Sequence, residues 1–483
     1  MSACVTASSS DILELHTLTM NNPMKARSIL LISSMLILGA GCTEESTTTA
    51  PIVPVEPTPD PDPDPTPLAV PTTYNFDSRF NTGESSVGIS GQITRQIQLQ
   101  DLKTVIGNLG KDGATAVTAD DLNGIYDYAD TGLNILTTVP DGLTASATTY
   151  EEVSTGKKMR GRQGTSAVLL GSTGIIGNDS DITVDELIQS FFTTIATNAA
   201  DATKLGTKAV YNTADGLDLS QMVNKVLMGA ILFDQMSSKY LGDILDKDNT
   251  VARGDGKSDT DQEHRFDEAY GYFGAARDYL SYTDIELAGS LSDFAEDSNS
   301  DGTLDFTTEY NFGFSRNAGK RDKGGSGVDF TKDIMSAFLA GRTAIVNGDL
   351  TVLATNRKAA SEGFEKVIAA TVVHYINDSM DDMATLTADE VANKNNYNLN
   401  KHWGEMKGFT FALQFGYRGA ATGGALAIIS EADVASLHTL MGNAPLYAEV
   451  GSTAHDAYLV DLKAAKDILK AAYGFSDTNM AGW

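Results

Sequence analysis

The chain has 483 residues, of which 41% are hydrophobic and 20% are charged, a composition typical of a globular protein with a substantial core. Its formal net charge of −29 argues against a nucleic-acid partner, because phosphate groups require a basic protein surface. The same charge favours a secreted, well-solvated protein and a cationic or metal-ion partner.

The N-terminal region predicts a lipid-anchored protein. Residues 1–23 have no signal character, and we interpret them as a mis-assigned leader, with Met24 as the true start. Residues 24–41 combine a basic start, an apolar run and small residues before Cys42, as a signal peptide does. The arrangement resembles a bacterial lipoprotein signal in which Cys42 is lipidated, with an ordinary cleaved signal peptide as the alternative. Thr43 after the cysteine is compatible with sorting to the outer membrane.

A proline-rich tether is expected between the lipid and the folded body. Nine of the twelve prolines fall between residues 43 and 72, and such a segment favours extended polyproline II. Residues 42–73 are therefore predicted to be a disordered spacer, and residues 74–483 the folded domain. No cysteine follows Cys42, which excludes disulfides and cysteine-ligated metal sites from that domain.

The folded domain is predicted to be all-α. Apolar residues recur at helical spacing, whereas strand-like alternation is short and scattered. Thr183 with Glu186, and Thr260 with Glu263, have the spacing of capping boxes at helix starts. We expect roughly ten helices in one or two packed bundles. The main predicted helices cover residues 92–108, 183–195, 219–245, 260–280, 330–346, 352–376, 388–415, 431–440 and 454–472.

Histidines paired with carboxylates are the first candidate site. On the helix predicted for residues 260–280, His264 shares a face with Asp267 or Glu268. His402 stands in the same relation to Glu405, and His374 lies on a further predicted core helix. A helical bundle can gather such groups around iron or another divalent metal. The alternative is a hydrogen-bonded network without metal.

If the two histidine pairs share one site, their helices pack together. Gly271, one turn after Glu268, is then expected to allow the close approach between the helices of His264 and His402. Convergence would favour a metal or ligand site, and wide separation would favour an interaction module.

An acidic loop is the second candidate site, and its expected ion is calcium. Oxygen ligands at alternate positions and a glycine at the sixth resemble a calcium-binding loop. The pattern fails at its twelfth position, and Glu309, one residue late, is the expected replacement ligand. A solvated acidic turn is the alternative. The other candidate ligands are Asp297, Asn299, Asp301, Thr303 and Asp305.

A small basic cluster follows this loop. We expect its side chains to form salt bridges with the nearby acidic loops, with anion binding as the alternative. No nucleophile elbow, phosphate-binding glycine loop, dinucleotide fingerprint or zinc-protease motif is present in the sequence, so hydrolase interpretations lack support. The cluster consists of Arg316, Lys320, Arg321 and Lys323.

Four phrases of the sequence resemble a family of bacterial lipoproteins of unknown function. They are Glu84-Ser-Ser-Val with Ser90-Gly-Gln92, His264 through Gly274, Asp301-Gly with Glu309-Tyr-Asn-Phe312, and His402-Trp-Gly-Glu-Met-Lys407. The resemblance covers nearly all of residues 74–483. More distantly, the chain is similar to imelysin-like proteins, helical envelope proteins linked to iron acquisition and marked by Gly-x-His-x-x-Glu. His402 and Glu405 match that motif, but Asn400 replaces its glycine.

These observations define three functional hypotheses. The first is an outer-membrane-anchored lipoprotein that binds a ligand or a metal, in line with the iron acquisition that the imelysin resemblance implies. The second is a metal-dependent envelope enzyme, such as an imelysin-like peptidase, that uses His264, His402 and Glu405. The third is an interaction module for a protein partner in the envelope.

Overall fold

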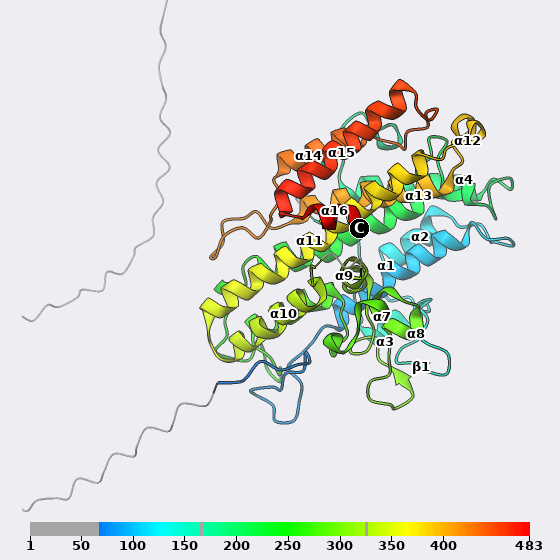
Figure 1. Cartoon of the computed structure of the whole chain (residues 1–483). Helices are drawn as coiled ribbons and strands as arrows, with labels where there is room; N and C mark the ends of the chain where they lie inside the picture. The colour runs from blue at the N-terminus through cyan, green and yellow to red at the C-terminus, as the bar shows by residue number, and fades with distance from the viewer. Residues whose placement is uncertain (1–66, 165–167, 324–326) are drawn as a thin grey trace, which may run out of the picture. The chain divides into compact units, whose positions relative to one another are not determined.

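Helices provide nearly all of the regular structure, which confirms the all-α prediction (Figure 1). The computed structural model describes residues 67–164, 168–323 and 327–483. The proposed leader, the signal peptide, Cys42 and most of the tether lie outside these residues. Ten of the sixteen α-helices in the described part have nine residues or more, as the expectation of roughly ten helices requires.

The first part of the folded domain contains six α-helices and one very short strand. These are α1 (Ser90–Asn108), α2 (Ala119–Tyr126), β1 (Thr144–Ala145), α3 (Tyr150–Val153), α4 (Val184–Ala199), α5 (Leu219–Leu227) and α6 (Asp261–Phe273). Between α5 and α6 the chain forms two π-helical segments, η3 (Met228–Phe233) and η4 (Gln235–Leu241).

The second part contains ten α-helices and the partner strand of β1. These are α7 (Asp284–Ala288), α8 (Leu291–Phe294), β2 (Thr303–Leu304), α9 (Gly313–Asp322), α10 (Phe330–Val346), α11 (Leu350–Met383), α12 (Ala388–Asn393), α13 (Tyr397–Ala412), α14 (Glu431–Met441), α15 (Thr453–Tyr473) and α16 (Asp477–Gly482). β1 and β2 pair in parallel, with Thr144 opposite Thr303.

Three predicted helices differ from the observed ones in their bounds or in their helical geometry. The helix expected over residues 260–280 ends at Phe273, because Gly274 adopts a left-handed conformation with φ 75° and caps it. The helix expected over residues 388–415 is broken after α12 by Lys394, at φ 50°, and restarts where Asn396 caps α13. The single helix expected over residues 219–245 begins as α5 and widens into the π-helical η3 and η4.

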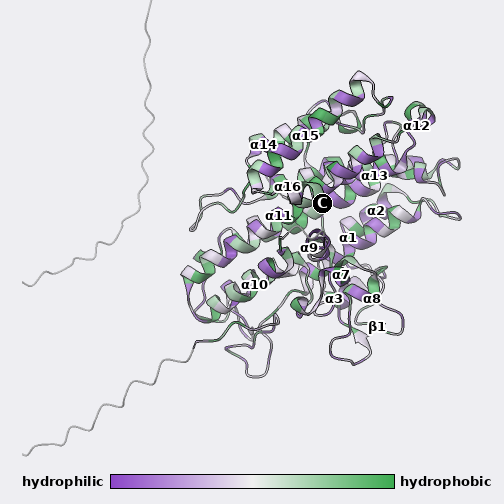
Figure 2. Cartoon of the chain, viewed as in Figure 1, coloured by the Kyte–Doolittle hydropathy of each residue, from purple (hydrophilic) through white to green (hydrophobic). Residues whose placement is uncertain are grey.

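The 34-residue helix α11 forms the centre of the domain and packs against α10, α13 and α15 (Figure 1). Every residue from Val367 to Val373 is buried, so this stretch has no solvent-facing side. Many of the other helices carry hydrophilic and hydrophobic residues in alternation along their length (Figure 2). The described residues belong to one compact unit. None of their helices combines the length and apolar character that crossing a membrane requires.

Small residues bring α13 unusually close to the α5–η3 helix. Gly404, Gly408 and Ala412 follow one another at four-residue spacing along α13 and face α5 and η3. A Cβ atom on Gly408 would lie 2.5 Å from the Cβ of Lys225, and one on Gly229 would lie 2.4 Å from the Cα of Ala412. This contact places the side chains of the two helices within reach of one another.

We expect Gly229→Ala to destabilise the protein by about 1–3 kcal/mol, because the added methyl group meets the backbone of α13. Gly124→Ala in α2 is the matched control, since its Cβ would meet no atom within 4 Å and alanine is the better helix former. Urea denaturation of both variants measures the difference. Equal free energies of unfolding for the two variants would contradict this close packing.

Candidate functional site

Glu263 and Asp267 of α6 belong to a buried ion network rather than to an open site. Arg342 of α10 places Nη1 3.0 Å from Oε1 of Glu263 and Nε 2.9 Å from Oδ1 of Asp267. All three side chains are fully buried. Burial raises the pKa of Asp267 to about 6 although Arg342 opposes the shift. For Glu263, burial is opposed by Arg342, by the N–H group of Thr260 and by Arg79, which together lower its pKa.

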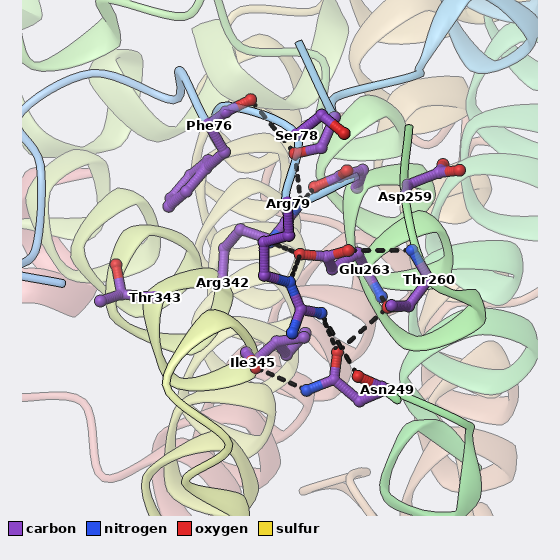
Figure 3. Close-up of polar contacts among 12 residues, drawn as sticks. Phe76, Ser78, Arg79, Asn249, Asp259, Thr260, Glu263, Arg342, Thr343 and Ile345 are labelled. Carbon is purple, nitrogen blue, oxygen red and sulfur yellow. Dashed lines mark hydrogen bonds and ion pairs between the residues drawn. The ribbon is translucent and has the colours of Figure 1, made fainter. Parts of the chain in front are cut away.

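The N-terminal segment of the domain is fastened to the same network. The Tyr74 hydroxyl donates to Asp267 at 2.9 Å, and Arg342 donates to the Ser86 hydroxyl at 2.7 Å. Arg79 reaches Glu263 from the other side, with Nε 3.1 Å from Oε1 (Figure 3). Residues 74–86 are thereby joined to α6 and α10 through charge-assisted hydrogen bonds.

His264 lies beside this network with carboxylate partners of its own. Its Nδ1 is 3.1 Å from Asp259, and its Nε2 is 3.6 Å from Glu268, which also accepts a hydrogen bond from Gln92. The expectation that Gly271 brings α6 against the helix of His402 is wrong. A Cβ atom on Gly271 would meet Ile89 and Gln92 at the start of α1, so α1 makes the close approach.

The structure does bring together His374 and His402. Oδ2 of Asp378 lies 3.4 Å from Nε2 of His374 and 3.7 Å from Nε2 of His402. Asp382, one turn further along α11, lies 2.7 Å from Nδ1 of His402. Burial lowers the pKa of His374 to about 3, whereas Asp382 outweighs burial at His402 and raises its pKa.

Glu405 has different partners from His402, although both lie on α13. Its Oε1 accepts a hydrogen bond from the Tyr375 hydroxyl at 2.9 Å and lies 3.3 Å from Nζ of Lys225. Burial opposes its ionisation, but the surrounding lysines outweigh burial and lower its pKa. In this position Glu405 is the counter-ion of Lys225.

Within residues 67–164, 168–323 and 327–483, no group of three or more His, Cys, Asp or Glu side chains is arranged to hold a metal ion. Of the six proposed histidine-site residues, His374 and His402 share Asp378, whereas the other four contact other partners. A metal at any of them stays a prediction and would require side chains to exchange their present partners for the ion.

The acidic loop is held in shape by its own carboxylates. Asp297 accepts hydrogen bonds from the N–H groups of Asp301 and Gly302, and Asn299 accepts one from Asp301. Gly302 has φ 84°, which fits the sharp turn expected there. Glu309 is buried and accepts from the N–H groups of Ser298 and Asp305. Asp305 accepts from Thr307, and Thr303 belongs to β2. Calcium binding here stays a prediction.

A pocket of about 240 Å³ lies among α1, α5, η3 and α9, and amines dominate its charge. We call it the lysine pocket. Its cationic side chains come from three different helices, and Gln100, Asn224 and Asn317 add neutral polar groups to its wall. The cations are Lys103 of α1, Lys225 of α5, and Arg316 and Lys320 of α9.

Burial and repulsion from neighbouring cations lower the pKa values of two amines of the lysine pocket, those of Lys103 and Lys320. Repulsion from Lys225, followed by burial, lowers the pKa of Lys103 to about 7. Lys320 is an exposed residue. Its amine is nevertheless partly shielded from water, and this burial, followed by repulsion from Arg316, lowers its pKa to about 8. Among the described residues Lys103 forms no ion pair with a carboxylate, and Lys225 pairs only with Glu405.

The prediction that the basic cluster around α9 forms salt bridges with the nearby acidic loops is wrong. In the described part of the chain none of its four side chains forms an ion pair with a carboxylate. Arg316 instead donates to the carbonyls of Leu287 and Gly289 and lies 3.5 Å from the ring centre of Phe294. Burial lowers its pKa. Two of the four cations, Arg316 and Lys320, line the lysine pocket.

Sequence reasoning missed Lys103 and Lys225. Lys103 gave no distinct signal, because a lysine in a helix is normally solvated. Lys225 lies among other polar residues of α5, Ser220, Gln221 and Asn224, and only the structure shows that it is buried. A charged residue in a wholly buried helix requires a partner or a ligand.

Comparison with known families places this chain in a defined group. A family model described as a domain of unknown function, DUF4856, matches residues 71–447, which is more than three quarters of the chain. The protein belongs to this family. No curated protein and no solved structure matches the chain.

We expect Arg342→Met to lower the free energy of unfolding by about 3–5 kcal/mol, because Glu263 and Asp267 would lose their common buried partner. Arg79→Met removes a partly exposed cation from the same Glu263 and should cost only about 0–1 kcal/mol. Chemical denaturation of the two variants provides the comparison. Similar small losses for both would show that the buried network does not depend on Arg342.

Proposed function

We propose that this protein is a lipid-anchored binding protein of the bacterial cell envelope, and that its ligand is a small anion held in the lysine pocket. The observation that carries the proposal is the concentration of cations there, in a protein whose net charge is −29. Gathering like charges costs free energy, which an anionic ligand would offset. A concave site with a few convergent polar groups is the usual form of a small-molecule site.

The charge of the pocket also bears on the expectation of a metal ligand. The amines and Arg316 would repel a free divalent cation, and Glu405 is the one carboxylate that pairs with them among the described residues. A metal ion is compatible with this pocket only as part of a negatively charged complex. Under the link to iron acquisition that the imelysin resemblance implies, the ligand of this pocket would therefore be an anionic iron carrier and not the free ion.

No observation favours the metal-dependent enzyme over the binding protein. That hypothesis required His264, His402 and Glu405 around one ion, but each contacts a different set of partners. An interaction module for an envelope protein stays the alternative if the pocket binds no anion.

Anion binding can be measured by calorimetry on the chain from residue 43 onward, with sulfate, phosphate and citrate at constant ionic strength. We expect saturable binding of at least one anion, and Lys103→Met should weaken it about tenfold or more, since a hydrogen bond to a charged group contributes about 1.5–3 kcal/mol. Lys103 is the suitable target because its removal leaves no carboxylate unpaired.

Lys111→Met, at an exposed lysine just beyond α1, is the matched control and should leave the affinity unchanged. An equal loss in both variants would indicate non-specific attraction. Absence of saturable binding for every anion would refute the proposed function.

Anchoring at the envelope is tested by Cys42→Ser in the full chain. We expect this variant to move from the membrane fraction to the soluble fraction and to lose lipid labelling, because the thiol that accepts the lipid is gone. The melting temperature of the folded domain should not change. Unchanged lipid labelling and membrane retention would contradict the lipoprotein assignment.

A further inference from the structure

The cations of the lysine pocket outnumber its anions by a margin that constrains the ligand. The three lysines and Arg316 carry four positive charges when protonated, against the one negative charge of Glu405. Lys103 and Lys225 lie beside one another on α1 and α5, and the described residues place no carboxylate on Lys103. With Glu405 paired to Lys225, a net charge of three remains, of which a singly charged ligand would neutralise one and a doubly charged ligand two.

The size of the pocket sets a second limit. A volume of about 240 Å³ holds on the order of eight water molecules, at ~30 Å³ for each. A tetrahedral oxyanion or a short dicarboxylate fits wholly inside this volume, whereas a nucleotide would extend out of the pocket. Neutral amides from Gln100, Asn224 and Asn317 can donate to further oxygen atoms of such a ligand.

We infer that the lysine pocket selects a compact ligand with two negative charges, of the phosphate or the dicarboxylate class, and takes up a proton when the ligand binds. This inference rests on the proposed function and specifies its ligand. The two classes share their chemistry, which is a pair of anionic oxygens within reach of neighbouring amines.

Proton uptake follows from the groups that surround Lys103. Lys225 of α5 and Lys320 of α9 repel its ammonium, while Glu405 of α13 attracts it, and the pKa of Lys103 is lowered to about 7. For Lys320, with a pKa of about 8, the facing groups are Arg316, Lys225, Arg321 and Glu405. Near pH 8 the amines of Lys103 and Lys320 are therefore only partly protonated in the free pocket.

A bound dianion adds opposite charge beside these amines and raises their pKa values. The stabilisation of the complex by these protons is fully present below the pKa values of the free pocket. It is lost as the pH rises through the higher values of the complex. The affinity for an anion whose own charge stays constant should accordingly fall as the pH rises above about 7.

Sulfate is the appropriate probe, because it is a dianion throughout the range from pH 6 to pH 9. We expect sulfate to bind more tightly at pH 7 than at pH 9 by about tenfold, which corresponds to linkage with about one proton over part of this range. Calorimetry at pH 8 in two buffers of different ionisation enthalpy should show net proton uptake. Malonate in place of sulfate distinguishes the dicarboxylate from the tetrahedral class, and nitrate tests the need for two charges.

Lys103→Arg separates charge from titration, because a guanidinium stays protonated at every pH used. The variant should keep sulfate binding at pH 8 and show reduced proton uptake, whereas Lys111→Arg should behave like the native protein. Lys320→Arg serves the same purpose if arginine at position 103 impairs folding, as judged from its melting temperature.

Sulfate binding without proton uptake by the native protein would overturn this inference and leave the proposed function intact. Equal affinities for nitrate and sulfate would overturn the requirement for two charges. If none of sulfate, malonate, phosphate and citrate shows saturable binding, the proposed function fails together with the inference.

Discussion

The buried contact of Arg342 with Glu263 and Asp267 is the constraint on which much of this fold depends. It joins α10 to α6 in a region without solvent, and it also holds Tyr74 and Ser86 from the start of the domain. Each buried charge would be costly alone, so the groups must be positioned together. Asp267, which the sequence offers as a candidate metal ligand, has Arg342 and Tyr74 as its partners here.

A second constraint, the close approach of α13 to α5, determines where the remaining charges lie. Glycines on α13 allow contact with the backbone of α5, and this brings Glu405 to Lys225. The adjacent π-helical segment η3 contributes Met228 and Leu232 to the wall of the lysine pocket. Such wide helical turns are frequent at functional sites, which agrees with the position of the pocket.

The histidines illustrate how one pattern can have different consequences. His264 and His402 have the same spacing to a downstream carboxylate, but only His402 lies near a second histidine, through Asp378. Glu405, which the sequence analysis pairs with His402, contacts Lys225 instead. Residues at i and i+3 share a helix face only approximately, so the neighbouring helix decides which side chains interact.

The sequence by itself determined the all-α class and the capping boxes at Thr183 and Thr260, because these depend on residues within a few positions of one another. The widening of the 219–245 helix and the break at Lys394 were decided only by the tertiary structure. So was the meeting of Lys103 with Lys225, which lie more than one hundred residues apart. Contacts of that kind depend on how helices pack, and no short-range pattern records them.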